Sequence, residues 1–158
     1  GGESTTIGRL AADYGLVEPI RAYVASGGAV WGTCAGLILL ADRADGPQGP
    51  IGGLHVDVVR NAFGRQVDSF ETDLDVRGLA SDEPYRAVFI RAPAVTSVDP
   101  GVEVLAALAP DRIVAVRQGR LLGTAFHPEL GDDLRFQRRF LSLAPTARLR
   151  SSRTLTGL

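Results

Sequence analysis

The sequence predicts an α/β fold, in which helices cover both faces of a sheet that antiparallel strands extend. Two observations lead to this prediction. In the first part of the chain, helical periodicity alternates with short apolar runs of strand length. From residue 54 onward, strand patterns follow one another, and two of them are joined by a tight turn. Alternation is typical of a sheet covered by helices, and consecutive strands are typical of antiparallel pairing.

Two helices are expected before the first strand. Over residues 4–14, apolar side chains recur at helical spacing, Ser4 suits the N-cap position and Gly15 suits the end of a helix. Residues 19–26 repeat this pattern and stop at a Gly-Gly pair. Both segments therefore predict short amphipathic helices.

A strand and a helix follow, joined by a very short turn. Residues 29–32 predict a buried strand, and residues 35–41 predict an apolar helix. Residues 45–53, DGPQGPIGG, have the composition of a loop. The turn between this strand and this helix carries the single cysteine of the chain.

Six strands and a closing helix are expected in the remainder. The strand patterns cover residues 54–60, 70–76, 85–92, 102–108, 112–118 and 121–126. The turn Gln118-Gly119-Arg120 joins the last two in a hairpin, and residues 132–143 predict the closing helix. Residues 1–144 thus form one domain, and residues 145–158 form a polar tail.

The composition is that of an ordinary globular domain and excludes several classes of protein. Apolar residues make up 45% of the 158 residues, and charged residues make up 22%. The net charge of −1 argues against a phosphate-binding surface, so neither nucleic acid nor a membrane is an expected partner. No apolar run reaches the roughly 18 residues of a membrane-spanning helix. A single cysteine cannot form an internal disulfide, which favours the reducing cytoplasm.

Cys34 lies in the segment Gly32-Thr-Cys-Ala-Gly36, between the predicted strand and the predicted helix. This arrangement is typical of a nucleophile elbow, a tight turn that presents a nucleophile at the end of a strand. The flanking glycines leave room for the turn, and the N–H groups at the start of the helix favour the thiolate. The alternative is a buried structural cysteine, because free cysteines are among the most buried residues.

A thiolate catalyst requires a base and a group that orients the base. His127 follows a predicted strand, and Glu129 stands two residues further on, beyond a rigid proline. Taken alone, this His-Pro-Glu segment is better explained as an ordinary loop, so the chemical interpretation depends on the elbow. The other histidine, His55, shares a strand face with Asp57 and is interpreted as a structural or surface residue.

The elbow at Cys34, followed by His127-Pro-Glu129, resembles the class I, triad-type glutamine amidotransferases, which hydrolyse glutamine to glutamate and ammonia. Four further segments resemble one branch of that family, the glutaminase subunits of pyridoxal 5′-phosphate synthase. They are GGESTT at residue 1, RNAFGRQ at residue 60, FIRAP at residue 89 and TAFHPEL at residue 124. The resemblance runs from residue 1 to about residue 143.

The resemblance implies a role for each segment. It implies a triad in which Cys34 attacks the substrate amide and forms a glutamyl thioester, His127 transfers the proton and Glu129 holds the imidazole. It implies an oxyanion hole made by the backbone N–H groups of Gly2 and Ala35. The residues implied for binding L-glutamine are Gly1, Gly2, Glu3, Arg60, Ile90 and Arg91. No metal and no cofactor is expected.

Elementary electrostatics agrees with the charged members of this set. An arginine such as Arg60 or Arg91 suits the carboxylate of a free amino acid, and Glu3 suits its ammonium group. The alternatives are solvated charges at strand ends for the two arginines and a favourable charge at a helix N-terminus for Glu3.

The resemblance also implies a fold, a partner and a missing segment. The fold is a flavodoxin-like three-layer α/β/α domain, with a mostly parallel central sheet and an antiparallel extension. Family members begin with a strand–helix–strand unit, whereas this chain starts at Gly-Gly-Glu without a methionine, so it is expected to be N-terminally incomplete. The partner is the synthase subunit, a (β/α)₈ barrel in an oligomeric ring, which receives the ammonia and activates the glutaminase.

Three other interpretations remain open. Another triad amidotransferase, such as the glutaminase of imidazole glycerol phosphate synthase, shares the elbow and the His-Pro-Glu segment, although the segments at residues 60 and 89 favour the first branch. A cysteine peptidase of related fold would not need a glutamine pocket. A non-catalytic binding subunit would keep the fold without the chemistry, although all three triad positions are filled.

Overall fold

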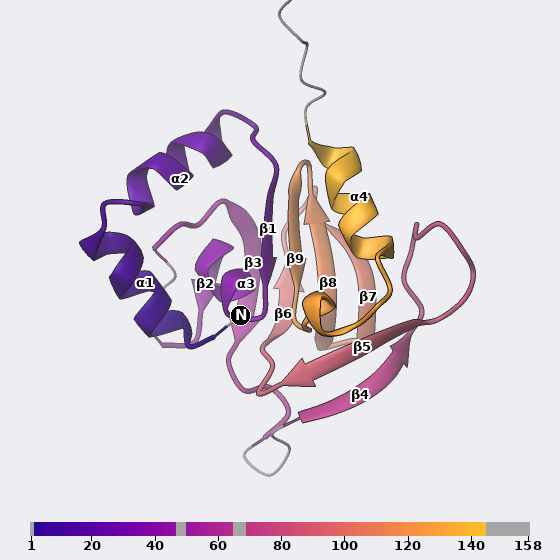
Figure 1. Ribbon diagram of the computed structural model, residues 1–158. Coiled ribbons are helices and arrows are strands. Elements are labelled where there is room, and N and C mark those ends of the chain that lie inside the picture. The colour runs from indigo at the N-terminus through magenta and orange to yellow at the C-terminus, as the bar shows by residue number, and fades with distance from the viewer. Residues whose placement is uncertain (1, 47–49, 65–68, 145–158) are drawn as a thin grey trace, which may run out of the picture.

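The structure, a computed structural model, describes residues 2–46, 50–64 and 69–144 (Figure 1). Its helices are α1 (Ser4–Asp13), α2 (Val17–Ala25), α3 (Ala35–Leu40) and α4 (Arg135–Leu143), with the 3₁₀ turn η1 (Pro128–Leu130). Its strands are β1 (Val30–Thr33), β2 (Ala41–Ala44), β3 (Leu54–Val59), β4 (Ser69–Leu74), β5 (Tyr85–Ile90), β6 (Ala94–Val98), β7 (Glu103–Ala109), β8 (Arg112–Gln118) and β9 (Leu121–Thr124). The expected tail, residues 145–158, lies outside the described residues.

The sequence predicts the four α-helices and seven of these nine strands, with ends that differ by a few residues. It does not predict β2 or β6. The helix expected over residues 35–41 ends at Leu40, and β2 begins at the next residue with no loop between them. The strand expected over residues 85–92 ends at Ile90, and β6 follows after Pro93.

The main sheet has seven strands, in the order β1-β9-β8-β6-β3-β2, and β7 also pairs with β8. Parallel pairing joins β1 to β9 and β2 to β3, whereas the pairs β3–β6, β6–β8, β7–β8 and β8–β9 are antiparallel. The expectation of a mostly parallel sheet is therefore wrong for the described residues. The short turns between β7, β8 and β9 permit only antiparallel neighbours, and β4 and β5 pair antiparallel in a separate ribbon.

The helices lie at different sides of the strands. In Figure 1, α1 and α2 lie together at the left, and α4 lies at the right, where its Phe136 and Phe140 pack against Trp31 of β1. The short helix α3 packs against β1 and β9, and α1 packs against α3. Within the part of the chain that the structure describes, no helix is long and apolar enough to cross a membrane.

An aromatic cluster joins α4 to the ends of β5 and β9. The rings of Tyr85, Phe89, Phe126 and Phe136 are almost fully buried. The centroid of Phe126 lies 5.2 Å from that of Phe136, and 5.6 Å from those of Tyr85 and Phe89. Because Phe126 directly precedes His127, the cluster fixes the chain at the start of the His-Pro-Glu segment.

The N-cap of α1 is Glu3, whereas the sequence predicts Ser4. The Glu3 carboxylate accepts hydrogen bonds from the backbone N–H groups of Thr5, at 2.9 Å, and Thr6, at 2.7 Å. Ser4 is instead the first residue of the helix, and its side chain is buried. A longer acceptor can thus replace the short serine side chain as the cap.

This cap predicts a pH-dependent contribution of Glu3 to stability. The N–H of Thr5 and the contacts with Thr6 lower the pKa of Glu3 from 4.5 to about 2. Since the folded-state pKa is the lower one, the stabilisation is complete above about pH 4.5 and is lost as the pH falls toward 2. We expect Glu3→Gln to lower the melting temperature at about pH 6, and the difference from wild type to shrink at about pH 3. A difference that does not change with pH would contradict a charged cap.

Candidate active site

Cys34 occupies the sharp turn between β1 and α3. Its backbone has φ 50° and ψ −107°, a conformation that residues other than glycine rarely adopt. A Cβ at Gly32 would lie 2.4 Å from the carbonyl oxygen of Gly36, so β1 and α3 can approach this closely only because residue 32 is glycine. The turn expected from the sequence is present, and its strained backbone conformation is that of Cys34.

Strand β9 brings the His-Pro-Glu segment to the same sheet edge as Cys34. Strands β1 and β9 are parallel, with Thr33 opposite Thr124. The N–H of Cys34 donates to the carbonyl oxygen of Thr124 at 2.7 Å, and Trp31 Nε1 donates to Thr124 Oγ1 at 3.1 Å. Because Thr124 is fully buried, these bonds fix the elbow relative to the residues that follow β9.

The thiol of Cys34 is buried. The residue is 6% exposed, and its Sγ lies 3.9 Å from the carbonyl oxygen of Ile90. Burial raises the pKa of the Cys34 thiol, although hydrogen bonds from the backbone N–H groups of Ala35 and Gly2 oppose this effect. The N–H groups at the start of α3 favour the thiolate, as expected, but burial outweighs them, so a neighbouring base is needed to remove the proton.

His127 and Glu129 form a hydrogen-bonded pair. His127 Nδ1 lies 2.8 Å from Glu129 Oε1, and the backbone N–H of His127 donates to the carbonyl oxygen of Val88 at 2.9 Å. Partial burial alone would raise the pKa of Glu129, but the hydrogen bonds from His127 and from its own backbone N–H hold that pKa below its usual value. A carboxylate on Nδ1 leaves Nε2 of the imidazole as the nitrogen that can accept a proton.

A cavity of 320 Å³ connects the elbow with His127. The predicted site residues that line it are Gly2, Glu3, Cys34, Ala35, Arg60, Ile90, Arg91 and His127. Glu129 does not line the cavity, but it contacts His127, which does. Gly1 lies outside the described residues. A larger cavity of 590 Å³ lies between α2 and the β8–β9 turn, but none of the candidate catalytic residues lines it.

Backbone strain is concentrated at this cavity. Among the residues that the structure describes, three residues other than glycine have positive φ: Cys34 (50°), Asn61 (48°) and Arg91 (42°). All three line the 320 Å³ cavity. Such conformations cost about 1–3 kcal/mol each and are typical of functional sites.

Arg60 and Glu3, two charged residues of the cavity, already form hydrogen bonds within the protein. Arg60 Nη1 donates to Ser4 Oγ at 2.9 Å, and its backbone N–H donates to Asp45 Oδ1 at 2.7 Å. The guanidinium of Arg60 is thereby fixed against the first turn of α1. The Glu3 carboxylate is already occupied as a helix cap, so its backbone is the part of Glu3 best placed to serve a ligand.

Sequence reasoning does not identify four residues that line this cavity, namely Ser4, Ile38, Asn61 and Pro93. One signal was available at Asn61, because asparagine adopts positive φ more readily than most residues and it follows a predicted strand. The role of Ser4 depends on Arg60, which is 56 residues away, so no local pattern indicates it.

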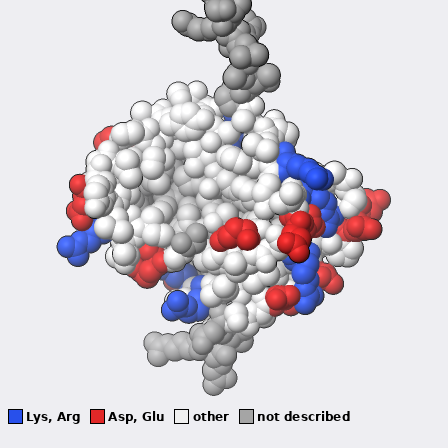
Figure 2. Space-filling model, in the orientation of Figure 1, with Lys and Arg blue, Asp and Glu red and all other residues white. Residues whose placement is uncertain are grey.

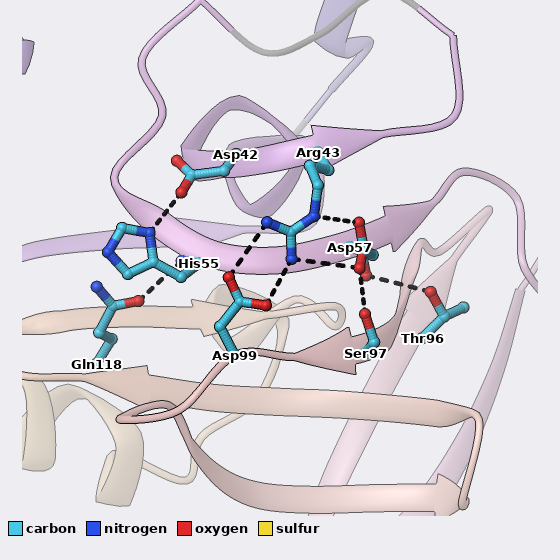
Figure 3. A network of polar contacts seen from close by, with 8 residues as sticks. All are labelled: Asp42, Arg43, His55, Asp57, Thr96, Ser97, Asp99 and Gln118. Atoms are coloured by element: carbon cyan, nitrogen blue, oxygen red, sulfur yellow. Dashed lines mark hydrogen bonds and ion pairs between the residues drawn. The ribbon is translucent and has the colours of Figure 1, made fainter.

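His55 lies outside this cavity, in a polar network at the strands β2, β3 and β6 (Figure 3). Its Nδ1 is 2.5 Å from Asp42 Oδ2, and the side chain is half exposed. In the same network, Arg43 bridges Asp57 and Asp99. The interpretation of His55 as a structural or surface residue is confirmed. Within the described residues, no group of three or more His, Cys, Asp or Glu residues could hold a metal ion.

Comparison with known proteins identifies the family. The model of the SNO glutamine amidotransferase family matches residues 1–144. The chain is 55% identical over 150 residues to "Pyridoxal 5′-phosphate synthase subunit PdxT" of Clavibacter sepedonicus, covering 93% of this chain and 71% of that protein. It is 61% identical over 147 residues to the protein of the same name in Parafrankia sp. (strain EAN1pec), covering 90% of this chain and 71% of the relative.

Solved structures agree with this match. A crystal structure of a glutamine amidotransferase superposes with a TM-score of 0.83 at 52% identity, covering 90% of this chain and 75% of that one. A protein from Thermoplasma acidophilum, whose name assigns it to GMP synthase, shares only the fold, with a TM-score of 0.55 at 14% identity, covering 82% and 64%. The fold is thus the mixed α/β fold of the class I glutamine amidotransferases, and the chain belongs to the SNO glutamine amidotransferase family.

Proposed function

We propose that this chain acts as the glutaminase subunit of a pyridoxal 5′-phosphate synthase, hydrolysing L-glutamine to L-glutamate and ammonia. Membership of the SNO family and the names of the relatives support this assignment. The observation that carries it is the cavity that holds Cys34 and His127 together, with Glu129 on the far nitrogen of the imidazole.

The triad performs the reaction in two halves. His127 accepts the thiol proton of Cys34, and the sulfur attacks the side-chain amide carbon of glutamine to form a C–S bond. His127 then donates this proton to the amide nitrogen, the C–N bond breaks and ammonia leaves a glutamyl thioester. In the second half His127 deprotonates a water molecule, which attacks the thioester, and the proton returns to sulfur as glutamate departs.

Backbone groups stabilise the charge that develops on the substrate oxygen. The backbone N–H groups of Ala35 and Gly2 lower the pKa of the Cys34 thiol and both residues line the cavity, which supports placing them where the oxyanion forms. Glu129 keeps the imidazole in one orientation and stabilises its charged form.

The remaining lining residues suit a free amino acid. Arg60, fixed by Ser4 and Asp45, is placed to pair with the carboxylate of glutamine, and Arg91 stands at the same cavity. Backbone groups of Gly2, Glu3 and Ile90 supply the other contacts. We include Gly1 in this set because it begins the same loop.

The second subunit is proposed from the names of the relatives. We expect ammonia to pass to a synthase subunit built as a (β/α)₈ barrel in an oligomeric ring, because free ammonia would be protonated in water and lose its nucleophilicity. Ile90 at the cavity and Leu130 after Glu129 are exposed apolar side chains that a partner would cover. The single cysteine cannot form an internal disulfide, which supports a location in the reducing cytoplasm.

The arrangement of the helices supports a finer description of the fold. With α1 and α2 at one side of the strands and α4 at the other, we propose the flavodoxin-like three-layer α/β/α arrangement for this domain (Figure 1). The residues 1–144 that match the family are proposed as one domain, followed by the tail 145–158.

Glutamate release and covalent labelling test the proposed activity together. We expect this chain to release glutamate from glutamine, faster when a synthase subunit is added, and to be labelled at Cys34 by an electrophilic glutamine analogue. Peptide mass spectrometry locates the label, and excess glutamine should protect against it. Absence of both turnover and labelling in the presence of the synthase subunit would favour a non-catalytic binding subunit, whereas labelling without turnover would place the fault in the second half-reaction.

A further inference from the structure

A third cavity, of 440 Å³, lies between α4, the segment that follows β4 and the strand β8. Four arginines line it: Arg117 from β8, and Arg135, Arg138 and Arg139 from α4. Figure 2 shows basic side chains gathered over this part of the molecule, beside acidic ones. The cavity shares no lining residue with the cavity at Cys34.

Two of the four arginines are neutralised by carboxylates. Arg117 Nε donates to Glu103 Oε2 at 2.8 Å. Arg135 forms a close pair with Asp133, with Nη2 2.6 Å from Oδ2, and also donates to Ser81 Oγ and two backbone carbonyls. Arg117 and Arg135 therefore stabilise the fold, and a carboxylate balances the charge of each.

The other two arginines have no hydrogen-bonded carboxylate partner among the described residues. Arg138 is exposed, and its side chain makes no hydrogen bond or ion pair within that part of the chain. Arg139 Nη1 donates to the backbone carbonyls of Arg77 and Gly78, but its buried Nε has no acceptor among the described residues. Burial lowers the pKa of Arg139, and the opposing attraction of Glu103 is larger than the repulsion from Arg117. The cavity therefore holds positive charge that no hydrogen-bonded carboxylate among the described residues balances.

We propose that this cavity binds a phosphate monoester. A dianionic phosphate would pair with the guanidinium groups of Arg138 and Arg139, whose charges no hydrogen-bonded carboxylate among the described residues balances. The small and apolar residues Gly78, Leu79, Ala80 and Leu143 leave space for the organic part of the ligand. The net charge of −1 of the whole chain conceals this site, because α4 contains three arginines and no Asp or Glu.

The proposal is tested by isothermal titration calorimetry on the full chain, with no glutamine present. The probes are inorganic phosphate, pyridoxal 5′-phosphate and pyridoxal, which has the same ring and aldehyde but no phosphate. The choice of pyridoxal 5′-phosphate rests on the proposed function, whereas binding of inorganic phosphate does not. We expect the two phosphate compounds to bind and pyridoxal not to bind. Binding of all three with equal affinity, or of none, would overturn the proposal.

Two variants locate the binding. Arg138→Gln removes the charge of a side chain that makes no hydrogen bond or ion pair among the described residues. It should weaken binding of both phosphate compounds about tenfold, the effect of one lost charge-assisted hydrogen bond. Arg139→Gln should weaken binding at least as much, and its melting temperature shows whether the loop at Gly78 still packs. The matched control is Arg9→Gln, the same change of charge on exposed α1, which should not alter affinity. Equal affinity of Arg138→Gln and wild type, or equal weakening by Arg9→Gln, would contradict a site in this cavity.

Discussion

Replacing Cys34 by alanine is expected to reduce glutamate release by roughly 10⁴-fold or more, because the reaction then has no nucleophile. The rest of the site remains in place: His127 still contacts Glu129, and Arg60 is still held by Ser4. Glutamine should therefore bind to the Cys34→Ala variant without turning over. Glutamate release and glutamine binding, measured on the same preparation, separate these two effects.

The matched comparison for this variant is Cys34→Gly, which tests whether the nucleophile is held under strain. Position 34 has φ 50° and ψ −107°, which glycine adopts freely and which alanine and cysteine do not. Both variants lack the thiol and should be equally inactive. In thermal or denaturant unfolding, however, the glycine variant should be about 1 kcal/mol more stable than the alanine variant, after the entropic cost of glycine is taken into account.

Two outcomes would contradict this account of Cys34. Substantial glutaminase activity in Cys34→Ala, with the wild type excluded by mass spectrometry, would mean that another group attacks the amide. A glycine variant that is clearly less stable than the alanine variant would mean that the turn is not strained at residue 34. The first outcome concerns the chemistry and the second concerns the backbone, so they can be distinguished.

The catalytic candidates could be predicted because each lies in a short local pattern. A strand, a glycine-flanked cysteine and a helix are contiguous in the chain, and so are His127 and Glu129. Their meeting depends on the parallel pairing of β1 with β9, which sets Thr33 opposite Thr124. That pairing joins segments about 90 residues apart, and sequence periodicity alone does not contain it.

The parts that could not be predicted depend on contacts between distant segments. Strand β2 is four residues long, directly continues α3 and contains two alanines and two charged residues, so nothing local distinguishes it from helix. The order of the sheet likewise depends on which edges meet. The buried thiol is a similar case, because the sequence indicates helical N–H groups beside Cys34 but not the desolvation that raises its pKa.

Gly32→Ala is expected to cause the largest loss of stability of any single methyl group added at the site. The new Cβ would lie 2.4 Å from the carbonyl oxygen and 2.5 Å from the carbonyl carbon of Gly36, and 2.8 Å from the backbone nitrogen of Leu37. These are backbone atoms, so α3 would have to move away from β1. We expect a loss of about 3 kcal/mol, the upper part of the usual range for overpacking, and a fall in melting temperature of roughly 10 °C.

The second glycine of the elbow, Gly36, provides a control for Gly32→Ala. A Cβ at Gly36 would meet no atom within 4 Å, and the residue lies in α3 with an ordinary backbone conformation. Gly36→Ala should therefore keep or raise stability, by up to about 1 kcal/mol, since alanine is the better helix former. If Gly32→Ala were as stable as Gly36→Ala, the close approach of β1 and α3 would not exist in solution. Because that approach sets the turn at Cys34, the loss of stability in Gly32→Ala should be accompanied by a loss of glutaminase activity, whereas Gly36→Ala should retain both.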